Sequence, residues 1–102
     1  MKVYNKLVRD KIPAIIEADG KTCEVEIASK EEMTKLLEDK LMEEVNEYLE
    51  DKNLEELADV MEVLFGLACN LGYTEEGLVG KRLEKLGERG GFKDGVVLKY
   101  VK

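Results

Sequence analysis

The residues best suited to chemistry lie in one acidic stretch, residues 43–59, which reads EEVNEYLEDKNLEELAD. It contains two pairs of carboxylates with a spacing of three residues, Glu44 with Glu47 and Glu56 with Asp59. Side chains three residues apart lie on the same face of an α-helix. Carboxylate oxygens are the ligands that Mg²⁺ prefers in proteins. Two such pairs facing each other across antiparallel helices would therefore supply four ligands to Mg²⁺ or Mn²⁺.

The position of these acids on their helices distinguishes a metal site from an ordinary solvated face. Acidic residues on helices usually face solvent. At about 100° per residue, however, Glu44 falls inside the apolar stripe of its helix, and Glu47 lies between two of the apolar residues. In the next helix Glu56 falls within the apolar arc and Asp59 at its edge, whereas Glu55 points to the opposite face. Because burying carboxylates without a cation is costly, the inward acids predict a bound metal ion.

The side-chain types that are absent narrow the chemistry further. The sequence contains no histidine, which removes the most common general base and the most common ligand of transition metals. Cys23 and Cys69 lack C-x-x-C spacing and lie in apolar surroundings, which predicts buried thiols in a cytoplasmic protein. Any metal must then be held by oxygen, which favours Mg²⁺, with Mn²⁺ as the alternative, over Zn²⁺.

Length and charge limit the architecture and the partners. The chain has 102 residues, enough for one compact domain, residues 1–102. Its formal net charge of -7 argues against a nucleic acid as partner, because phosphate backbones bind to basic surfaces. Charges interrupt its apolar stretches every few residues, so we expect no membrane span and no membrane partner. A domain of this size buries only a modest part of its surface, which favours association into a homodimer or homotetramer.

Apolar spacing and capping residues predict four helices. They are a short helix after Asp10, a long one capped by Ser29 and ending near Asp51, a third from Asn53 to Asn70 or Leu71, and a fourth from Thr74 to Gly90. The short break near residue 52 makes the two long helices antiparallel neighbours. Residues 21–28 alternate between apolar and polar and residues 96–101 are β-prone, so the sequence allows one small β pairing between them. The expected fold is all-α, an antiparallel helical bundle with a short N-terminal helix.

Two groups of basic residues are candidates for binding an anionic substrate. Lys81, Lys85 and Arg89 recur every four residues and form a cationic ridge on the fourth helix. The ordinary interpretation is a solvated face whose cations pair with neighbouring acids. A second basic cluster, residues 6–11, is explained equally well by surface solubility and by contact with a substrate.

Three segments of the chain together resemble a known family. The E-x-x-E and E-x-x-D pairs resemble the metal motif of the all-α nucleotide pyrophosphohydrolase superfamily, which includes MazG-like proteins, phosphoribosyl-ATP pyrophosphohydrolase and dimeric dUTPases. YNKLVRDKIP at residues 4–13 and KLGERGGF at residues 85–92 resemble the ends of MazG-like proteins of the phosphoribosyl-ATP pyrophosphohydrolase-like branch. The likeness therefore spans nearly the whole chain.

The resemblance implies a Mg²⁺-dependent hydrolase that converts a nucleoside triphosphate, including non-standard ones in a house-cleaning role, to nucleoside monophosphate and pyrophosphate. It also implies that the metal is held by Glu44, Glu47, Glu56 and Asp59. In this interpretation an activated water attacks the α phosphorus. Because there is no histidine, the proton of that water passes either to Glu44 or to its neighbour Glu43. The cationic ridge would bind the phosphates, since a triphosphate needs positive groups besides the metal.

Two alternative functions stay open. The same site would serve phosphoribosyl-ATP, a substrate in histidine biosynthesis, because it offers the same phosphate chain. A function of another class is a non-catalytic helical oligomerisation module whose acids form salt bridges with a partner protein. A thermal shift that depends on Mg²⁺ separates the enzyme from such a module.

Overall fold

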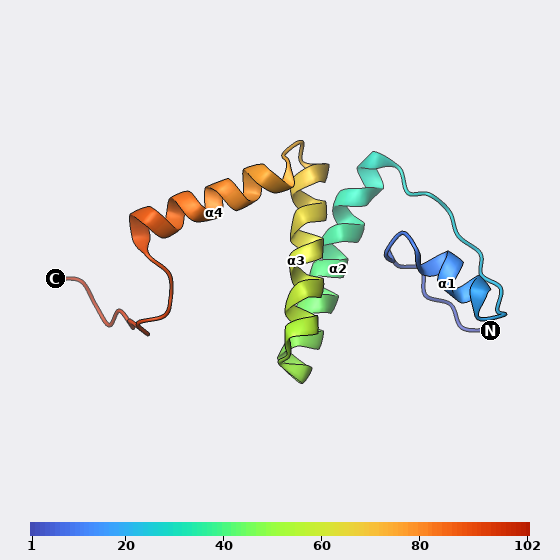
Figure 1. Ribbon diagram of the computed structural model, residues 1–102, viewed down its shortest axis with the longest axis horizontal. Helices are drawn as coiled ribbons and strands as arrows, with labels where there is room; N and C mark the ends of the chain where they lie inside the picture. Colours follow the sequence, from blue (N-terminus) through green and yellow to red (C-terminus); the bar gives the residue numbers. More distant parts are fainter.

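The computed structural model describes residues 1–102 as four helices joined by loops, without a β-strand (Figure 1). The helices are α1 (Ile12–Ala18), α2 (Lys30–Asp51), α3 (Leu54–Asn70) and α4 (Glu75–Arg89). The predicted all-α class is confirmed. The β pairing between residues 21–28 and 96–101 is wrong, because these two segments lie at opposite ends of the molecule (Figure 1). An extended segment without a neighbouring strand has no partner for its backbone hydrogen bonds.

Local capping residues fix where the two long helices begin and end. The Ser29 hydroxyl accepts a hydrogen bond from the Glu32 amide, and the Glu32 carboxylate accepts one from the Ser29 amide, which forms a capping box. Helix α2 ends at Lys52, which adopts the left-handed conformation with φ 50°. The Asn53 side chain then accepts a hydrogen bond from the Glu56 amide at 2.9 Å and begins α3. The chain reverses at this tight turn, so α2 and α3 run antiparallel, as the sequence predicts.

Helices α2 and α3 pack closely along their length. The buried apolar side chains of the chain all lie on these two helices: Leu37, Val63 and Ala68. Gly66 permits this approach, because a Cβ at that position would lie 3.1 Å from the Leu37 Cδ2 atom. At the end of the pair that is far from the turn, the Asn70 amide donates a hydrogen bond to the Thr34 hydroxyl at 2.7 Å. The helix pair therefore has a fixed register.

The remaining helices do not enclose a core around this pair. Helix α4 packs only against α3, and α1 packs against no other helix. The radius of gyration is 17.7 Å, whereas a compact domain of this length has about 13 Å. The exposed surface is 9340 Å², compared with ~5,800 Å² expected for a monomeric protein of this mass. One chain thus leaves much apolar surface open to solvent.

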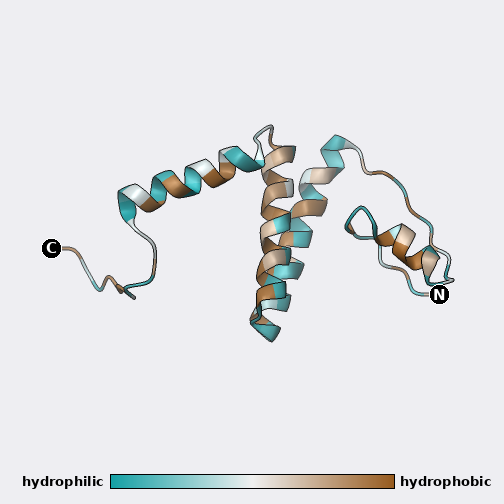
Figure 2. Cartoon of the chain, in the orientation of Figure 1, coloured by the Kyte–Doolittle hydropathy of each residue, from teal (hydrophilic) through white to brown (hydrophobic).

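Hydrophobic residues recur along α3 and α4 (Figure 2), and many of them are exposed. Those on α3 and α4 include Leu57, Met61, Leu64, Val79, Leu83 and Leu86. Such exposed apolar surfaces mark sites of association in soluble proteins. No helix is both long enough and apolar enough to pass through a membrane.

Two details of the sequence-based interpretation are wrong. Cys23 and Cys69 are exposed rather than buried. Cys23 belongs to the extended segment that has no strand partner, and Cys69 lies beside the turn between α3 and α4, where no other element covers it. Helix α1 begins after Lys11 rather than Asp10, and no side chain caps it. The other helix bounds agree with the predicted ones to within about a residue.

Candidate metal centre

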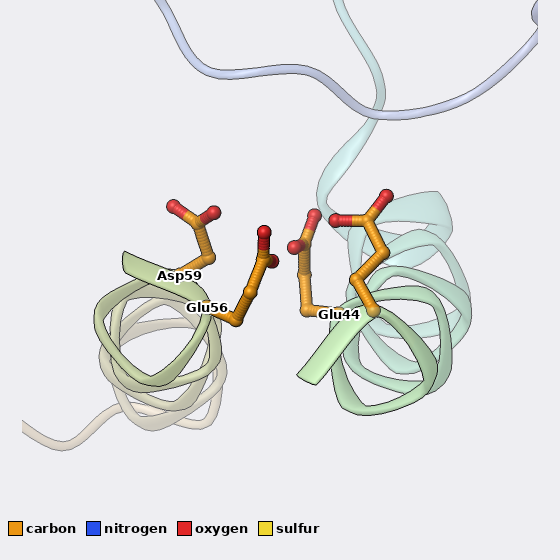
Figure 3. A group of neighbouring side chains, drawn as sticks. Glu44, Glu56 and Asp59 are labelled. Atoms are coloured by element: carbon orange, nitrogen blue, oxygen red, sulfur yellow. The ribbon is translucent and has the colours of Figure 1, made fainter. Parts of the chain in front are cut away.

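The structure brings together the four carboxylates that the sequence predicts as metal ligands. Glu44 and Glu47 belong to α2, and Glu56 and Asp59 belong to α3. Each offers one oxygen atom, and these four atoms all lie within 4.8 Å of one another. Figure 3 shows Glu44 on one helix beside Glu56 and Asp59 on the other. The arrangement follows from the spacing, because residues three apart share a helix face and antiparallel packing turns the two faces toward each other.

Glu44 is the only buried charged residue of the chain, with 6% of its surface exposed. Its Oε2 atom is buried and accepts no hydrogen bond, and the same is true of Glu56 Oε2. A buried carboxylate oxygen without a partner costs about 1–3 kcal/mol or more. Both orphaned atoms belong to the four-carboxylate cluster, so the cluster lacks positive charge at its centre. This donor set of carboxylate oxygens fits Mg²⁺ or Mn²⁺.

Crowding of negative charge shifts the pKa values within the cluster. Burial raises the pKa of Glu44, and the neighbouring Glu47 carboxylate raises it further. The pKa of Glu56 is also raised, first by burial and then by the negative charge of Asp59. A divalent cation would reverse both effects, because it stabilises the ionised form of each carboxylate that contacts it.

Two basic residues from the segment before α1 approach the cluster. Arg9 donates a hydrogen bond from Nη2 to Asp59 Oδ1 at 2.6 Å. Lys6 forms an ion pair with Glu43, the neighbour of the predicted ligand Glu44. For residues 6–11 the sequence allows both surface solubility and substrate contact. The two ion pairs place Arg9 at the cluster and Lys6 beside it. Nothing in the local sequence pattern identifies such partners, because the contacts join residues far apart in the chain.

Lys40 is a third cation at the site, which the sequence analysis missed. Its ammonium lies 3.1 Å from Glu43 Oε2 and 3.3 Å from Glu44 Oε1. The sequence contains the information needed to predict this contact, because Lys40 precedes Glu44 by four residues and side chains with this spacing are neighbours on a helix. The hydrogen bond from Lys6 is the main cause that lowers the pKa of Glu43, and Lys40 adds to it against the opposing effect of burial. The ion pairs of Glu43 thus favour its ionised form, and the proton-acceptor role of Glu43 or Glu44 stays a prediction.

The cationic ridge lies away from the carboxylates within one chain. Helix α4 leaves the far end of α3 and points away from the helix pair (Figure 1). Lys81 pairs with Glu84 on its own helix at 2.9 Å, and Lys85 and Arg89 form no ion pair. The substrate-binding role of Lys81, Lys85 and Arg89 therefore stays a prediction.

Comparison with protein-family models, curated proteins and solved structures finds no match to this chain. The prediction of a metal site therefore depends on the residues themselves. Its main support is the agreement between a helix phase worked out from the sequence and a cluster of four carboxylates in the structure.

Proposed function

We propose that this protein is a Mg²⁺-dependent nucleoside triphosphate pyrophosphohydrolase, with Mn²⁺ as an alternative metal. The observation that carries the proposal is the orphaned, buried Oε2 atom of Glu44 inside a cluster of four carboxylates. A set of solvated acids would have no reason to bury one of its members. The expected products are a nucleoside monophosphate and pyrophosphate, in line with the resemblance of the two acidic pairs to the MazG-like motif.

A phosphate chain is the substrate that best matches this set of side chains. Mg²⁺ keeps part of its coordination sphere for water and substrate phosphates when a protein supplies carboxylates. Basic groups stand directly beside the cluster, since Lys6, Arg9 and Lys40 all pair with its acids or with Glu43. A site that joins hard-cation ligands to basic side chains can neutralise several phosphate oxygens at once.

The division of work among the side chains follows from their positions. Glu44, Glu47, Glu56 and Asp59 would hold the metal. When bound, Mg²⁺ supplies neutralisation of the phosphate charge and activation of the attacking water. The chain orients the phosphates against the helix pair and accepts the proton of that water at a carboxylate of Glu44 or Glu43.

We also propose that the functional unit is a homodimer or homotetramer in which helix pairs of several copies form one antiparallel bundle. The exposed surface of 9340 Å² exceeds the ~5,800 Å² of a monomeric protein of this mass by about 3,500 Å² per chain. Two chains together could therefore bury more than the roughly 2,000–5,000 Å² of an obligate interface. The exposed apolar residues of α3 and α4 supply the surface that such packing would bury. Sedimentation should give two or four times the chain mass of 11.6 kDa. A species with the mass of one chain would overturn this part of the proposal.

A panel of nucleoside triphosphates assayed for pyrophosphate tests the enzymatic proposal. We expect release that requires Mg²⁺ or Mn²⁺ and disappears with a chelator. Glu44→Gln should abolish release, whereas Glu55→Gln, at an exposed residue of α3, should preserve it. If no nucleotide releases pyrophosphate and Mg²⁺ does not stabilise the protein, the non-catalytic oligomerisation module becomes the better account.

A further inference from the structure

The segment before α1 lies over the carboxylate cluster and is attached to it by charge. In Figure 3 the N-terminal part of the chain crosses the side of the helix pair toward which the carboxylates extend. Its attachment consists of the Arg9–Asp59 and Lys6–Glu43 ion pairs, together with a shallow hollow that Leu7 shares with Leu36 of α2. Because α1 packs against no other helix, little apolar packing opposes movement of this segment.

The Arg9–Asp59 ion pair can break at little cost in free energy. It is short, at 2.6 Å, yet the side chains of Arg9 and Asp59 are 55% and 38% exposed. Ion pairs with this exposure contribute only about 0–1 kcal/mol. The guanidinium contacts the carboxylate of a predicted metal ligand, so a divalent cation at the cluster would share that negative charge with it and repel it.

The Lys6–Glu43 ion pair, unlike the Arg9–Asp59 pair, does not involve a predicted metal ligand. Glu43 does not belong to the group of four carboxylates, so a metal ion there would not compete with Lys6. Glu43 raises the pKa of Lys6, chiefly through their hydrogen bond, and the ammonium stays charged. Lys6 can therefore stay paired with Glu43 while Arg9, three residues further along the chain, changes its partner.

We propose that Arg9 is an internal cation that exchanges partners: it holds Asp59 in the metal-free protein and binds the phosphate chain of the substrate once the metal takes Asp59. This inference rests on the proposed function. The guanidinium presents a planar fork of N–H donors that matches phosphate oxygens in a bidentate geometry. It remains beside the cluster through Lys6. The proposal thus supplies the phosphate-binding cation from within the chain, independently of the cationic ridge.

Two binding measurements on the intact protein separate this exchange from a structural role. The first is Mg²⁺ binding to the free protein by calorimetry. The second is binding of inorganic triphosphate at saturating Mg²⁺. We expect Arg9→Ala to tighten Mg²⁺ binding about two- to fivefold, because a competitor is removed. The same variant should weaken triphosphate binding at least about tenfold, because a charge-assisted contact is lost. A single substitution that strengthens Mg²⁺ binding and weakens triphosphate binding would be specific to the exchange.

Two further variants serve as controls. Lys11→Ala removes one positive charge at a nearby exposed position that forms no ion pair, and it should change both affinities less than twofold. Arg9→Lys keeps the charge without the planar fork, so Mg²⁺ binding should stay near that of the wild type while triphosphate binding weakens. Arg9→Ala that behaves like Lys11→Ala, or that weakens Mg²⁺ binding, would overturn the exchange and leave the metal centre standing. A wild-type protein that binds no Mg²⁺ would overturn both proposals.

Discussion

The substitution Glu44→Gln should have opposite effects on stability with and without metal. Glu44 is 6% exposed, and its Oε2 atom has no partner. The amide has nearly the same shape, removes the buried charge and can donate a hydrogen bond to the Glu47 carboxylate. A buried unpaired acceptor costs about 1–3 kcal/mol, and loss of the 3.3 Å contact with Lys40 offsets part of the gain. We therefore expect the metal-free variant to be about 1 kcal/mol more stable than the wild type, a rise of roughly 4–8 °C in Tm.

Addition of Mg²⁺ should make the wild type more stable than Glu44→Gln. A ligand at one hundred times its Kd stabilises the protein that binds it by about 2.7 kcal/mol. Glu44→Gln removes one of the predicted metal-binding carboxylates, so the variant should gain little stability from Mg²⁺ and should end less stable than the wild type.

Thermal unfolding followed by circular dichroism, with chelator or with Mg²⁺ and at one protein concentration, measures both differences. Glu55→Gln is the matched control, since Glu55 is exposed and lies outside the cluster, and it should follow the wild type in both conditions. A Glu44→Gln variant that is less stable than the wild type without metal, or that keeps the full response to Mg²⁺, would refute the reasoning.

Three further predictions concern the rest of the site. Substitution of each remaining predicted ligand should remove most pyrophosphate release, namely Glu47→Gln, Glu56→Gln and Asp59→Asn. Glu55→Gln and Glu62→Gln, at exposed positions of α3 outside the cluster, should have little effect. Because the pKa of Glu44 is raised in the folded protein, the free energy of unfolding of the metal-free protein should increase as pH falls from neutrality toward the ordinary pKa of 4.5. Chemical denaturation should show this increase in the wild type and a smaller one in Glu44→Gln. Lys85→Ala and Arg89→Ala should lower kcat/KM roughly ten- to a hundredfold without changing Mg²⁺ binding by the free protein, and wild-type kinetics would return both residues to a solvated face.

The sign of the pH prediction follows from proton uptake. A carboxyl group whose pKa is higher in the folded state binds more protons there than in the unfolded state over the interval between the two values. The carboxyl group therefore destabilises the folded state fully when the pH is above its raised, folded-state pKa, and not at all when the pH is below its ordinary, unfolded-state pKa. Glu43 acts in the opposite direction, because its pKa is lowered and its ion pairs are lost when it is protonated. The gain in stability should therefore end as pH approaches the range in which Glu43 becomes protonated.

Features that depend on neighbouring residues in the sequence could be predicted well. Ser29, Asn53 and Thr74 each accept a hydrogen bond from a backbone amide three residues ahead, and a cap of this kind is determined locally. The carboxylate cluster could be predicted for the same reason. Its two pairs each depend on one helix, and a turn near residue 52 is enough to bring the pairs face to face.

Features that depend on distant partners could not be predicted. Residues 21–28 alternate like a strand, yet a strand also needs a partner, and residues 96–101 lie at the other end of the molecule. The pairing of Arg9 with Asp59 joins positions 50 residues apart, which no local pattern encodes. Burial of Cys23 and Cys69 was expected from their apolar neighbours. The apolar neighbours of Cys23 are themselves exposed, because no strand pairs with that segment. Cys69 is exposed although its neighbour Ala68 is buried, because it lies on another face of α3.

The position at which water attacks the phosphate chain tests the central claim most directly. Hydrolysis in water enriched in ¹⁸O, followed by mass spectrometry of both products, shows which phosphorus receives the new oxygen. Attack at the α phosphorus places the label in the nucleoside monophosphate and leaves pyrophosphate unlabelled, and this is the result that we expect for the wild type with Mg²⁺. Label in pyrophosphate, or release of orthophosphate in its place, would contradict the proposed reaction.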